Sequence, residues 1–376
     1  MLKFVSDSIK NLVPYQPGKP IEEVQRELGI DYVVKLASNE NPLGPSPLGL
    51  TAAEESLSTI HRYPDGGAFH LRKKLSKRLG VTTQQLVFGN GSNEVIELIV
   101  RTFCRKGDSI ITSEGAFIAY FLCAKAHEVN CIQTPLLKDG SFDLNQIAEE
   151  AIQNSHARVI FLPNPNNPTG TVFTEEAFRA FYSKIKKERK DPILIVFDDA
   201  YSEYRDSKNL PDPIEWMKKE NNVLVTRTFS KAYGLSGLRV GYAVGPEVLI
   251  QTVEKIREPF NVNAVALAAA TAALEDQGFI DKTIRLNREE KLKWESFFKK
   301  HSIPFFSSQG NFILADFHAR TGMNGVDAFE ELLKRGVILR PVTGYGFPHH
   351  LRVSIGTQKE NEYAMTQIEE WFHAMG

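Results

Sequence analysis

The most informative segment of the chain is TFSKAYGLSGLR, which spans residues 228–239. The apolar run at 223–225 is typical of a strand, so Lys231 is expected at a strand's carboxyl end, where open α/β sheets bind ligands. Partial burial there would lower the pKa of the ammonium group and free its amine to attack a carbonyl. Ser230 and Arg239 offer a hydroxyl and a guanidinium fork, which suit a phosphate dianion. The segment indicates an aldehyde that carries a phosphate; the alternative is a surface lysine in a glycine-rich turn.

Two further segments place polar side chains at strand ends. A turn stiffened by prolines at 163–170 follows an apolar strand and carries Asn167. The continuous apolar run at 193–197 is typical of a parallel strand and leads to Asp198 and, three residues later, Tyr201. A carboxylate at this edge of the sheet can pair with a protonated ring nitrogen, and a phenol beside it can reach an oxygen of the same ring.

A third strand end resembles an anion site. The strand at 86–88 is followed by a glycine-rich turn and a helix that begins near residue 94. Backbone N–H groups at such a helix start are unpaired donors, and the helix dipole reinforces them. We therefore expect Gly91, Ser92 and Asn93 to contact the phosphate, and the alternative is an ordinary capped helix.

Taken together, these segments resemble the fold-type I pyridoxal-phosphate aminotransferases over nearly the whole chain. Asn-Pro-Thr-Gly at 167–170, the Asp198–Tyr201 pair, Lys231 and Arg239 occur in the order and approximate spacing of that family. The closer resemblance is to the histidinol-phosphate aminotransferase family. The segments that carry it are 36–47, 62–66, 89–94, 339–341, 344–346 and 351–356. Aromatic amino-acid aminotransferases and threonine-phosphate decarboxylases are similar in many of the same places.

The resemblance implies a role for each site residue. Lys231 would bind the pyridoxal phosphate and transfer protons, with Asp198 at the ring nitrogen and Tyr201 at the ring oxygen. The other expected cofactor contacts are Gly91, Ser92, Asn93, Phe117, Asn167, Thr228, Ser230 and Arg239, together with Tyr63 from a neighbouring subunit. The expected substrate contacts are Tyr15, Asn39, Arg340 and Arg352. For Phe117 the alternative is plain core packing, and for Arg340 it is a surface ion pair.

The pattern of elements predicts an α/β protein with a mostly parallel sheet. Short apolar strands alternate with helical segments, and charged helical sequence after about residue 270 leads into a region of mixed α and β character. We expect a large cofactor-binding α/β/α domain at 37–270 and a smaller α+β domain at 271–376. The resemblance implies that an amino-terminal arm, residues 1–36, joins the small domain.

Composition narrows the class of function. A net charge of −1 gives no electrostatic reason to expect nucleic acid or an anionic membrane as a partner. The three cysteines have no metal or disulfide spacing, and the amino terminus lacks an apolar core of signal-peptide length, so we expect a cytoplasmic protein without a metal. A pyridoxal-phosphate sensor fused to a DNA-binding domain is a distant alternative, because no basic helix-turn-helix region precedes Pro14.

The predicted function is transamination between L-histidinol phosphate and 2-oxoglutarate, which gives imidazole acetol phosphate and glutamate. The resemblance also implies a homodimer whose active sites are shared between subunits. Two alternatives stay open, an aromatic amino-acid aminotransferase and, further off, a threonine-phosphate decarboxylase.

Overall fold

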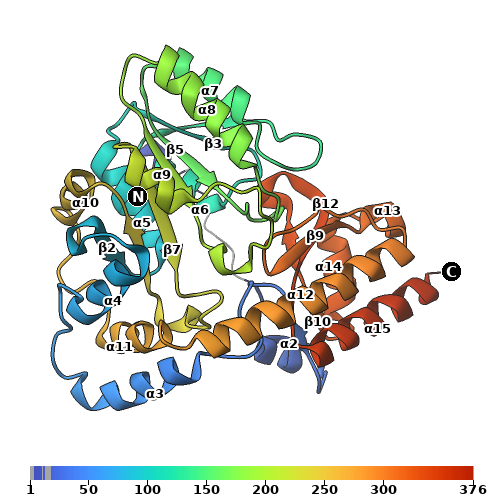
Figure 1. Cartoon of the computed structure of the whole chain (residues 1–376). Helices are drawn as coiled ribbons and strands as arrows, with labels where there is room; N and C mark the ends of the chain where they lie inside the picture. The colour runs from blue at the N-terminus through green and yellow to red at the C-terminus, as the bar shows by residue number, and fades with distance from the viewer. Residues whose placement is uncertain (1–3, 11, 13–17, 376) are drawn as a thin grey trace.

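The computed structural model describes residues 4–10, 12 and 18–375. The chain forms two lobes, which meet along one side of a central sheet (Figure 1). The large lobe surrounds the seven-stranded sheet, and the small lobe surrounds a three-stranded sheet formed by the last third of the chain. Tyr15 lies outside the described residues.

The central sheet is mostly parallel, as the sequence predicts. Only β8 runs antiparallel to its neighbours, β2 and β7. Across the sheet the strands are β2 (Leu86–Gly89), β8 (Gly241–Val244), β7 (Val223–Thr228), β6 (Leu194–Asp198), β5 (Ala157–Pro163), β3 (Ser109–Ser113) and β4 (Asn130–Thr134). Sequence analysis missed β4, because this edge strand is only partly buried and its residues, NCIQT, show no apolar run.

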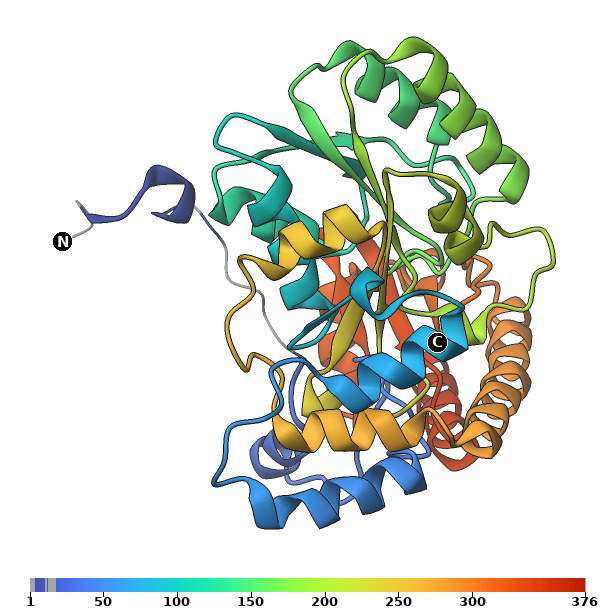
Figure 2. The same ribbon diagram turned by 60° about the vertical axis from the view of Figure 1, so that its left-hand side comes forward.

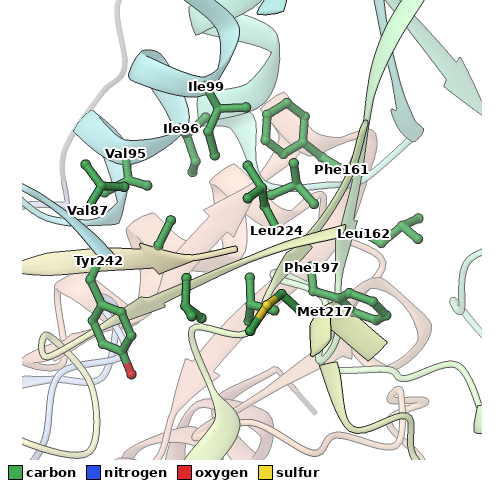
Figure 3. Packing of buried hydrophobic residues seen from close by; sticks show 14 of the residues in the cluster. Val87, Val95, Ile96, Ile99, Phe161, Leu162, Phe197, Met217, Leu224 and Tyr242 are labelled. Carbon is green, nitrogen blue, oxygen red and sulfur yellow. The ribbon is translucent and has the colours of Figure 1, made fainter. Parts of the chain in front are cut away.

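Helices on the two faces of the sheet bury its apolar side chains. They are α5 (Ser92–Phe103), α6 (Ile118–Ala126), α7 (Leu144–Gln153), α8 (Glu175–Glu188), α9 (Pro213–Lys219) and α10 (Glu247–Glu254). Helix α5 turns Val95, Ile96 and Ile99 toward the sheet, where they meet Phe161 and Leu224 (Figure 3). These side chains recur at helical spacing on one face of α5, so their burial fixes how the helix lies on the sheet.

Two helices that are far apart in sequence lie side by side at the edge of the large lobe (Figures 1 and 2). They are α3 (Pro47–Ser56) and α11 (Ala264–Ala273). Small residues allow this close approach, since a Cβ atom on Gly49 would lie 3.2 Å from the carbonyl oxygen of Ala269. A side chain at Gly49 would push the two helices apart.

The small lobe has its own core. Its antiparallel sheet has the order β11 (Arg340–Val342), β12 (Phe347–Ser354) and β9 (Phe312–Asp316), and β1 (Val34–Lys35) pairs in parallel with β10 (Val337–Ile338). Its helices are α2 (Ile21–Leu28), α13 (His318–Thr321), α14 (Gly325–Leu333) and α15 (Gln358–Ala374). Helix α12 (Gln277–Lys300) runs from the large core, at Phe279, to the small one, at Trp294 and Phe298. The boundaries at residues 36 and 270 stay a prediction.

Within the described part of the chain, no helix combines the length and the hydrophobicity that crossing a bilayer requires. The same residues contain no group of three or more histidine, cysteine, aspartate or glutamate side chains that could hold a metal ion.

A buried asparagine should contribute strongly to the small lobe's stability. The side chain of Asn361 in α15 donates to Glu290 Oε2 (2.9 Å) and the Gly356 carbonyl (2.8 Å), and it accepts from Trp294 Nε1 (2.9 Å). Asn361→Leu keeps the size of the side chain but leaves these groups without partners, at a cost of about 2–4 kcal/mol. We expect thermal unfolding followed by circular dichroism to show a clearly lower midpoint. The control is Thr366→Leu on the exposed side of α15, and equal midpoints for the two variants would contradict this role.

Candidate active site

A cavity of about 270 Å³ opens where the carboxyl ends of β5, β6 and β7 meet the small lobe. It is lined by Ser38, Asn39, Glu40, Ser92, Asn93, Phe117, Pro163, Pro165, Asn167, Asp198, Ala200, Tyr201, Thr228, Ser230, Lys231, Ser236, Arg239, Tyr345 and Arg352. The carboxyl edge of an open α/β sheet is the usual ligand site. Residues from both lobes therefore face one chamber.

Asp198, the last residue of β6, is a buried carboxylate held by neutral donors. Its Oδ2 accepts a hydrogen bond of 2.5 Å from the hydroxyl of Tyr120, and its Oδ1 accepts one of 3.3 Å from Thr226. Burial raises the pKa of Asp198 to about 6, although both hydrogen bonds act to lower it. A cation beside Asp198 would restore an ordinary carboxylate, so the site favours a positively charged ligand group.

The neighbouring Asp199 is paired with two arginines of the protein itself. Arg227 lies 2.7 Å from one of its carboxylate oxygens and Arg205 lies 3.2 Å from the other. Since consecutive residues at a strand end point in opposite directions, Asp198 faces the cavity while Asp199 forms an internal ion-pair cluster. The spacing between Asp198 and Tyr201 singles out the same aspartate in the sequence.

Lys231 lies just beyond β7, and its amine is 3.4 Å from the carbonyl oxygen of Ser38. Burial lowers the pKa of Lys231 to about 8, and the charge of Arg352 acts in the same direction. Near pH 8 about half of the molecules would therefore carry a neutral amine, which is the nucleophilic form.

Contacts between the lobes hold the opposite wall of the cavity. Asn39 donates to the hydroxyl of Tyr201 (3.0 Å), and its backbone N–H donates to Ser354 Oγ (2.8 Å). Arg352, in β12, donates to Asn167 Oδ1 (2.5 Å) and to the carbonyl of Ala37 (2.6 Å). Burial raises the pKa of Tyr201 to about 12, so its phenol stays protonated and can donate a hydrogen bond.

One end of the cavity gathers donors that suit an anion. Arg239 donates to Ser230 Oγ (3.3 Å), which also accepts from Thr228 (3.0 Å), and the first residues of α5 line the same end. Arg239 has a positive φ of 56°, an uncommon conformation for a residue other than glycine that is often found at functional sites. A Cβ atom on Gly91 would lie 2.3 Å from Arg239 Nη2, so only glycine leaves room for the guanidinium.

The cavity brings together most of the residues that the sequence nominates. Those that line it are Asn39, Ser92, Asn93, Phe117, Asn167, Asp198, Tyr201, Thr228, Ser230, Lys231, Arg239 and Arg352. Gly91 lies behind Arg239, as its close approach to that side chain shows. Arg340 is absent from the lining, although it lies opposite Arg352 in the register of strands β11 and β12. Whether these residues bind cofactor and substrate stays a prediction.

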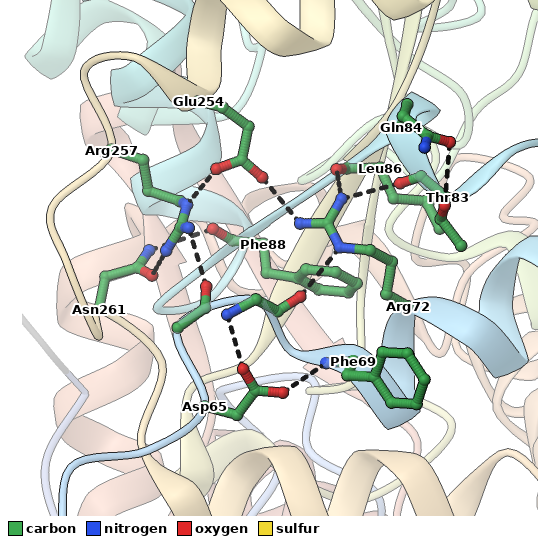
Figure 4. Close-up of polar contacts among 12 residues, drawn as sticks. Asp65, Phe69, Arg72, Thr83, Gln84, Leu86, Phe88, Glu254, Arg257 and Asn261 are labelled. Atoms are coloured by element: carbon green, nitrogen blue, oxygen red, sulfur yellow. Dashed lines mark hydrogen bonds and ion pairs between the residues drawn. The ribbon is translucent and has the colours of Figure 1, made fainter.

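Tyr63 is absent from the lining of the cavity in its own chain. Its side chain is 84% exposed and stacks on Phe260 with the ring centroids 4.8 Å apart. The loop that follows it is anchored, because Asp65 accepts from the backbone of Phe69 (2.7 Å) and Arg257 donates to the Gly66 carbonyl (2.9 Å) (Figure 4). A large aromatic ring is thus held on a rigid part of the surface.

Sequence reasoning missed several residues of the site. Tyr120 lies on α6, three residues after Phe117, and its ring stacks on Phe161 with centroids 4.6 Å apart. A tyrosine in a largely apolar helix could have signalled a buried hydrogen bond, because a buried phenol needs a partner. Glu40 and Tyr345 lie in segments that carry the family resemblance but were given no role, and Thr226, one strand away from Asp198, gave no signal of its own.

Comparisons with known proteins agree with this geometry. The model of the family described as aminotransferase class I and II matches residues 31–368. The chain is 44% identical over 367 residues to a histidinol-phosphate aminotransferase of Anaeromyxobacter sp. (strain Fw109-5), covering 98% of each protein. It is 42% identical over 374 residues to one of Bdellovibrio bacteriovorus, covering 97% of each.

Solved structures show the same fold. The histidinol-phosphate aminotransferase of Sinorhizobium meliloti in complex with pyridoxal-5'-phosphate superposes with a TM-score of 0.87 at 25% identity, covering 100% of this chain and 99% of that one. The aspartate aminotransferase of Thermus thermophilus with maleate has a TM-score of 0.83 at 18% identity, covering 97% and 99%, and shows the fold alone. The chain therefore belongs to the class I and II aminotransferases and, within them, to the histidinol-phosphate aminotransferase family.

Proposed function

We propose that this chain is a pyridoxal-phosphate enzyme that transfers the amino group of L-histidinol phosphate to 2-oxoglutarate, giving imidazole acetol phosphate and glutamate. The observation that carries the proposal is the buried Asp198 carboxylate, held by neutral donors in the same cavity as the amine of Lys231. The names of the relatives at 40–44% identity support this substrate and this reaction.

The residues of the cavity fit the cofactor at both of its ends. The space that Gly91 leaves for Arg239 completes a cradle for a phosphate, and the raised pKa of Asp198 suits a protonated ring nitrogen. When bound, pyridoxal phosphate supplies an aldehyde that condenses with amines and a ring that withdraws electrons from the substrate carbon. The proposed phosphate contacts are Ser92, Asn93, Thr228, Ser230 and Arg239, and the proposed ring contacts are Asp198, Asn167, Tyr201 and Phe117.

Asp198 and Tyr120 set the charge at the ring nitrogen. A carboxylate in contact with a cationic nitrogen contributes about 5 kcal/mol at an effective dielectric constant near 20, before desolvation is subtracted. The hydroxyl of Tyr120 orients the carboxylate through its bond of 2.5 Å and stays protonated, because burial raises its pKa. Asp198 can therefore hold a proton on the ring nitrogen throughout turnover.

Lys231 is the proposed acid and base. Its Nζ would accept the proton from the amine-bearing carbon of the substrate and return it to the cofactor carbon that had carried the aldehyde, and a pKa of about 8 suits both directions of transfer. Arg352 contributes twice, because its charge lowers the pKa of Lys231 and its guanidinium holds Asn167 in place. Tyr201 and Asn167 would donate hydrogen bonds to the ring oxygen.

Arginines supply the charge that recognises the anionic substrates. Arg340 and Arg352 are direct partners on adjacent antiparallel strands, so their side chains leave the same face of the sheet. We propose that this pair accepts the phosphate of histidinol phosphate and the carboxylates of glutamate in turn. Asn39 and Tyr15 are the other proposed substrate contacts, and Tyr15 lies outside the described residues.

The proposal includes a cytoplasmic homodimer with shared active sites. The exposed ring of Tyr63, on its anchored loop, is suited to reach the cofactor phosphate of a neighbouring subunit. The expected binding partners are small-molecule substrates, and binding to nucleic acid or to a membrane is not expected.

Substrate preference provides the direct test of this function. With glutamate as donor, kcat/KM should be about 10- to 100-fold higher for imidazole acetol phosphate than for phenylpyruvate, because a phosphate adds charge-assisted hydrogen bonds. The measurement is 2-oxoglutarate formation by purified protein. A preference for phenylpyruvate would indicate an aromatic amino-acid aminotransferase, and carbon dioxide release from threonine phosphate without an oxo acid would indicate a decarboxylase.

Subunit mixing tests the role of Tyr63. Lys231→Ala and Tyr63→Ala should each be badly impaired, yet their hybrid dimer contains one site with neither lesion. Random exchange makes about half of the dimers hybrids, and one of the two sites in each hybrid is intact. An equal mixture should therefore regain about a quarter of wild-type activity. Lys231→Ala mixed with a tagged copy of itself is the control. No recovery, with hybrids proven by mass spectrometry, would place Tyr63 outside the neighbour's site.

A further inference from the structure

A second, much smaller cavity lies behind the wall of the active site that Asn39 forms. It has a volume of about 10 Å³ and is lined in part by Tyr204, Asn287 and Asn311. Tyr204 follows β6 in a short 3-10 helix (Ser202–Tyr204), Asn287 belongs to α12, and Asn311 immediately precedes β9. Three separate segments thus converge on one small cavity.

Each of these three residues presents a buried oxygen atom that has no hydrogen-bond partner among the described residues. The atoms are Tyr204 Oη, Asn287 Oδ1 and Asn311 Oδ1, and the three residues are 3%, 6% and 2% exposed. A buried polar atom without a partner costs about 1–3 kcal/mol. Three residues that carry such atoms line the same cavity, which points to a common ligand.

The orientation of both asparagines is fixed by their amide nitrogens. Asn287 Nδ2 donates to the carbonyl of Gly310 (3.3 Å), and Asn311 Nδ2 donates to the carbonyl of Asn39 (3.0 Å). Flipping either amide would break this bond and turn an oxygen toward another carbonyl oxygen. Both amide oxygens must therefore be satisfied as acceptors, whereas the Tyr204 hydroxyl is available as a donor.

We infer that one water molecule binds in this cavity and bridges Tyr204, Asn287 and Asn311. Water has the required valence, since it donates two hydrogen bonds, one to each amide oxygen, and accepts one from the phenol. A volume of about 10–15 Å³ holds one water molecule, and three partners are typical of buried water. The ligands are neutral and few, which does not suit a metal cation.

The water has a consequence for the active site. It fixes Asn311, which donates to the carbonyl of Asn39, and Asn39 in turn donates to the hydroxyl of Tyr201. Tyr204 is therefore a positioning residue that acts on Tyr201 through the water, Asn311 and Asn39. This second step rests on the proposed function, because it takes Tyr201 as a ligand of the cofactor's ring oxygen.

Crystallography tests the water itself, independently of function. We expect a single spherical peak within about 2.6–3.2 Å of all three oxygen atoms in a structure that resolves ordered water. We expect the peak to be lost in Tyr204→Phe, which removes the donor and keeps the ring. An empty cavity in the wild-type protein, or a peak with the short and numerous contacts of a cation, would overturn the inference.

A spectroscopic titration tests the positioning role. If Tyr201 is less well held in Tyr204→Phe, the pH midpoint of the bound cofactor's visible absorbance should rise by about 0.5 unit, a threefold change in the ionisation constant. The matched control is Tyr182→Phe, a tyrosine whose hydroxyl contacts Glu220 and Asn222 instead. Equal midpoints for the two variants would overturn the positioning role, while a protein that binds no cofactor would refute the proposed function and leave the water intact.

Discussion

The site depends on a carboxylate that the protein buries without neutralising. Asp198 ends a central strand, with hydroxyl groups of Tyr120 and Thr226 as its hydrogen-bond donors, and burial raises its pKa to about 6. A buried charge without a cation in contact is costly, so this arrangement favours a positively charged ligand group. The next residue, Asp199, differs because two arginines of the protein neutralise its charge.

Around this carboxylate, the two lobes share the construction of one chamber. The large lobe supplies Lys231 and the anion cradle at strand ends, and the small lobe supplies Arg352 from β12. Hydrogen bonds from Arg352 to Asn167 and from the backbone N–H of Asn39 to Ser354 join the two lobes. Because Arg352 also lowers the pKa of Lys231, the position of the small lobe affects the reactivity of the amine.

Much of this arrangement could be predicted from sequence, because parallel strands deliver the residues that follow them to one edge of the sheet. That rule brings Asn167, Asp198 and Lys231 together without knowledge of the packing. The rule does not predict the position of Tyr120, which depends on how α6 lies on the sheet. Nor was β4 predicted from its sequence, because its residues alternate too weakly between apolar and polar. Tyr63 stacks on Phe260 of its own chain and stays largely exposed, so its proposed contact with a neighbouring subunit depends on assembly rather than on the fold of one chain.

The most direct test of the account is the protonation state of the cofactor's ring nitrogen, read by nitrogen-15 NMR with labelled pyridoxal phosphate. The wild-type protein and Asp199→Asn should show a protonated nitrogen. Asp198→Asn should show an unprotonated one, with kcat reduced by about a hundredfold or more, since losing one partner of a buried ion pair costs about 3–5 kcal/mol. A nitrogen that stays protonated in Asp198→Asn, or loses its proton only in Asp199→Asn, would contradict the role given to Asp198.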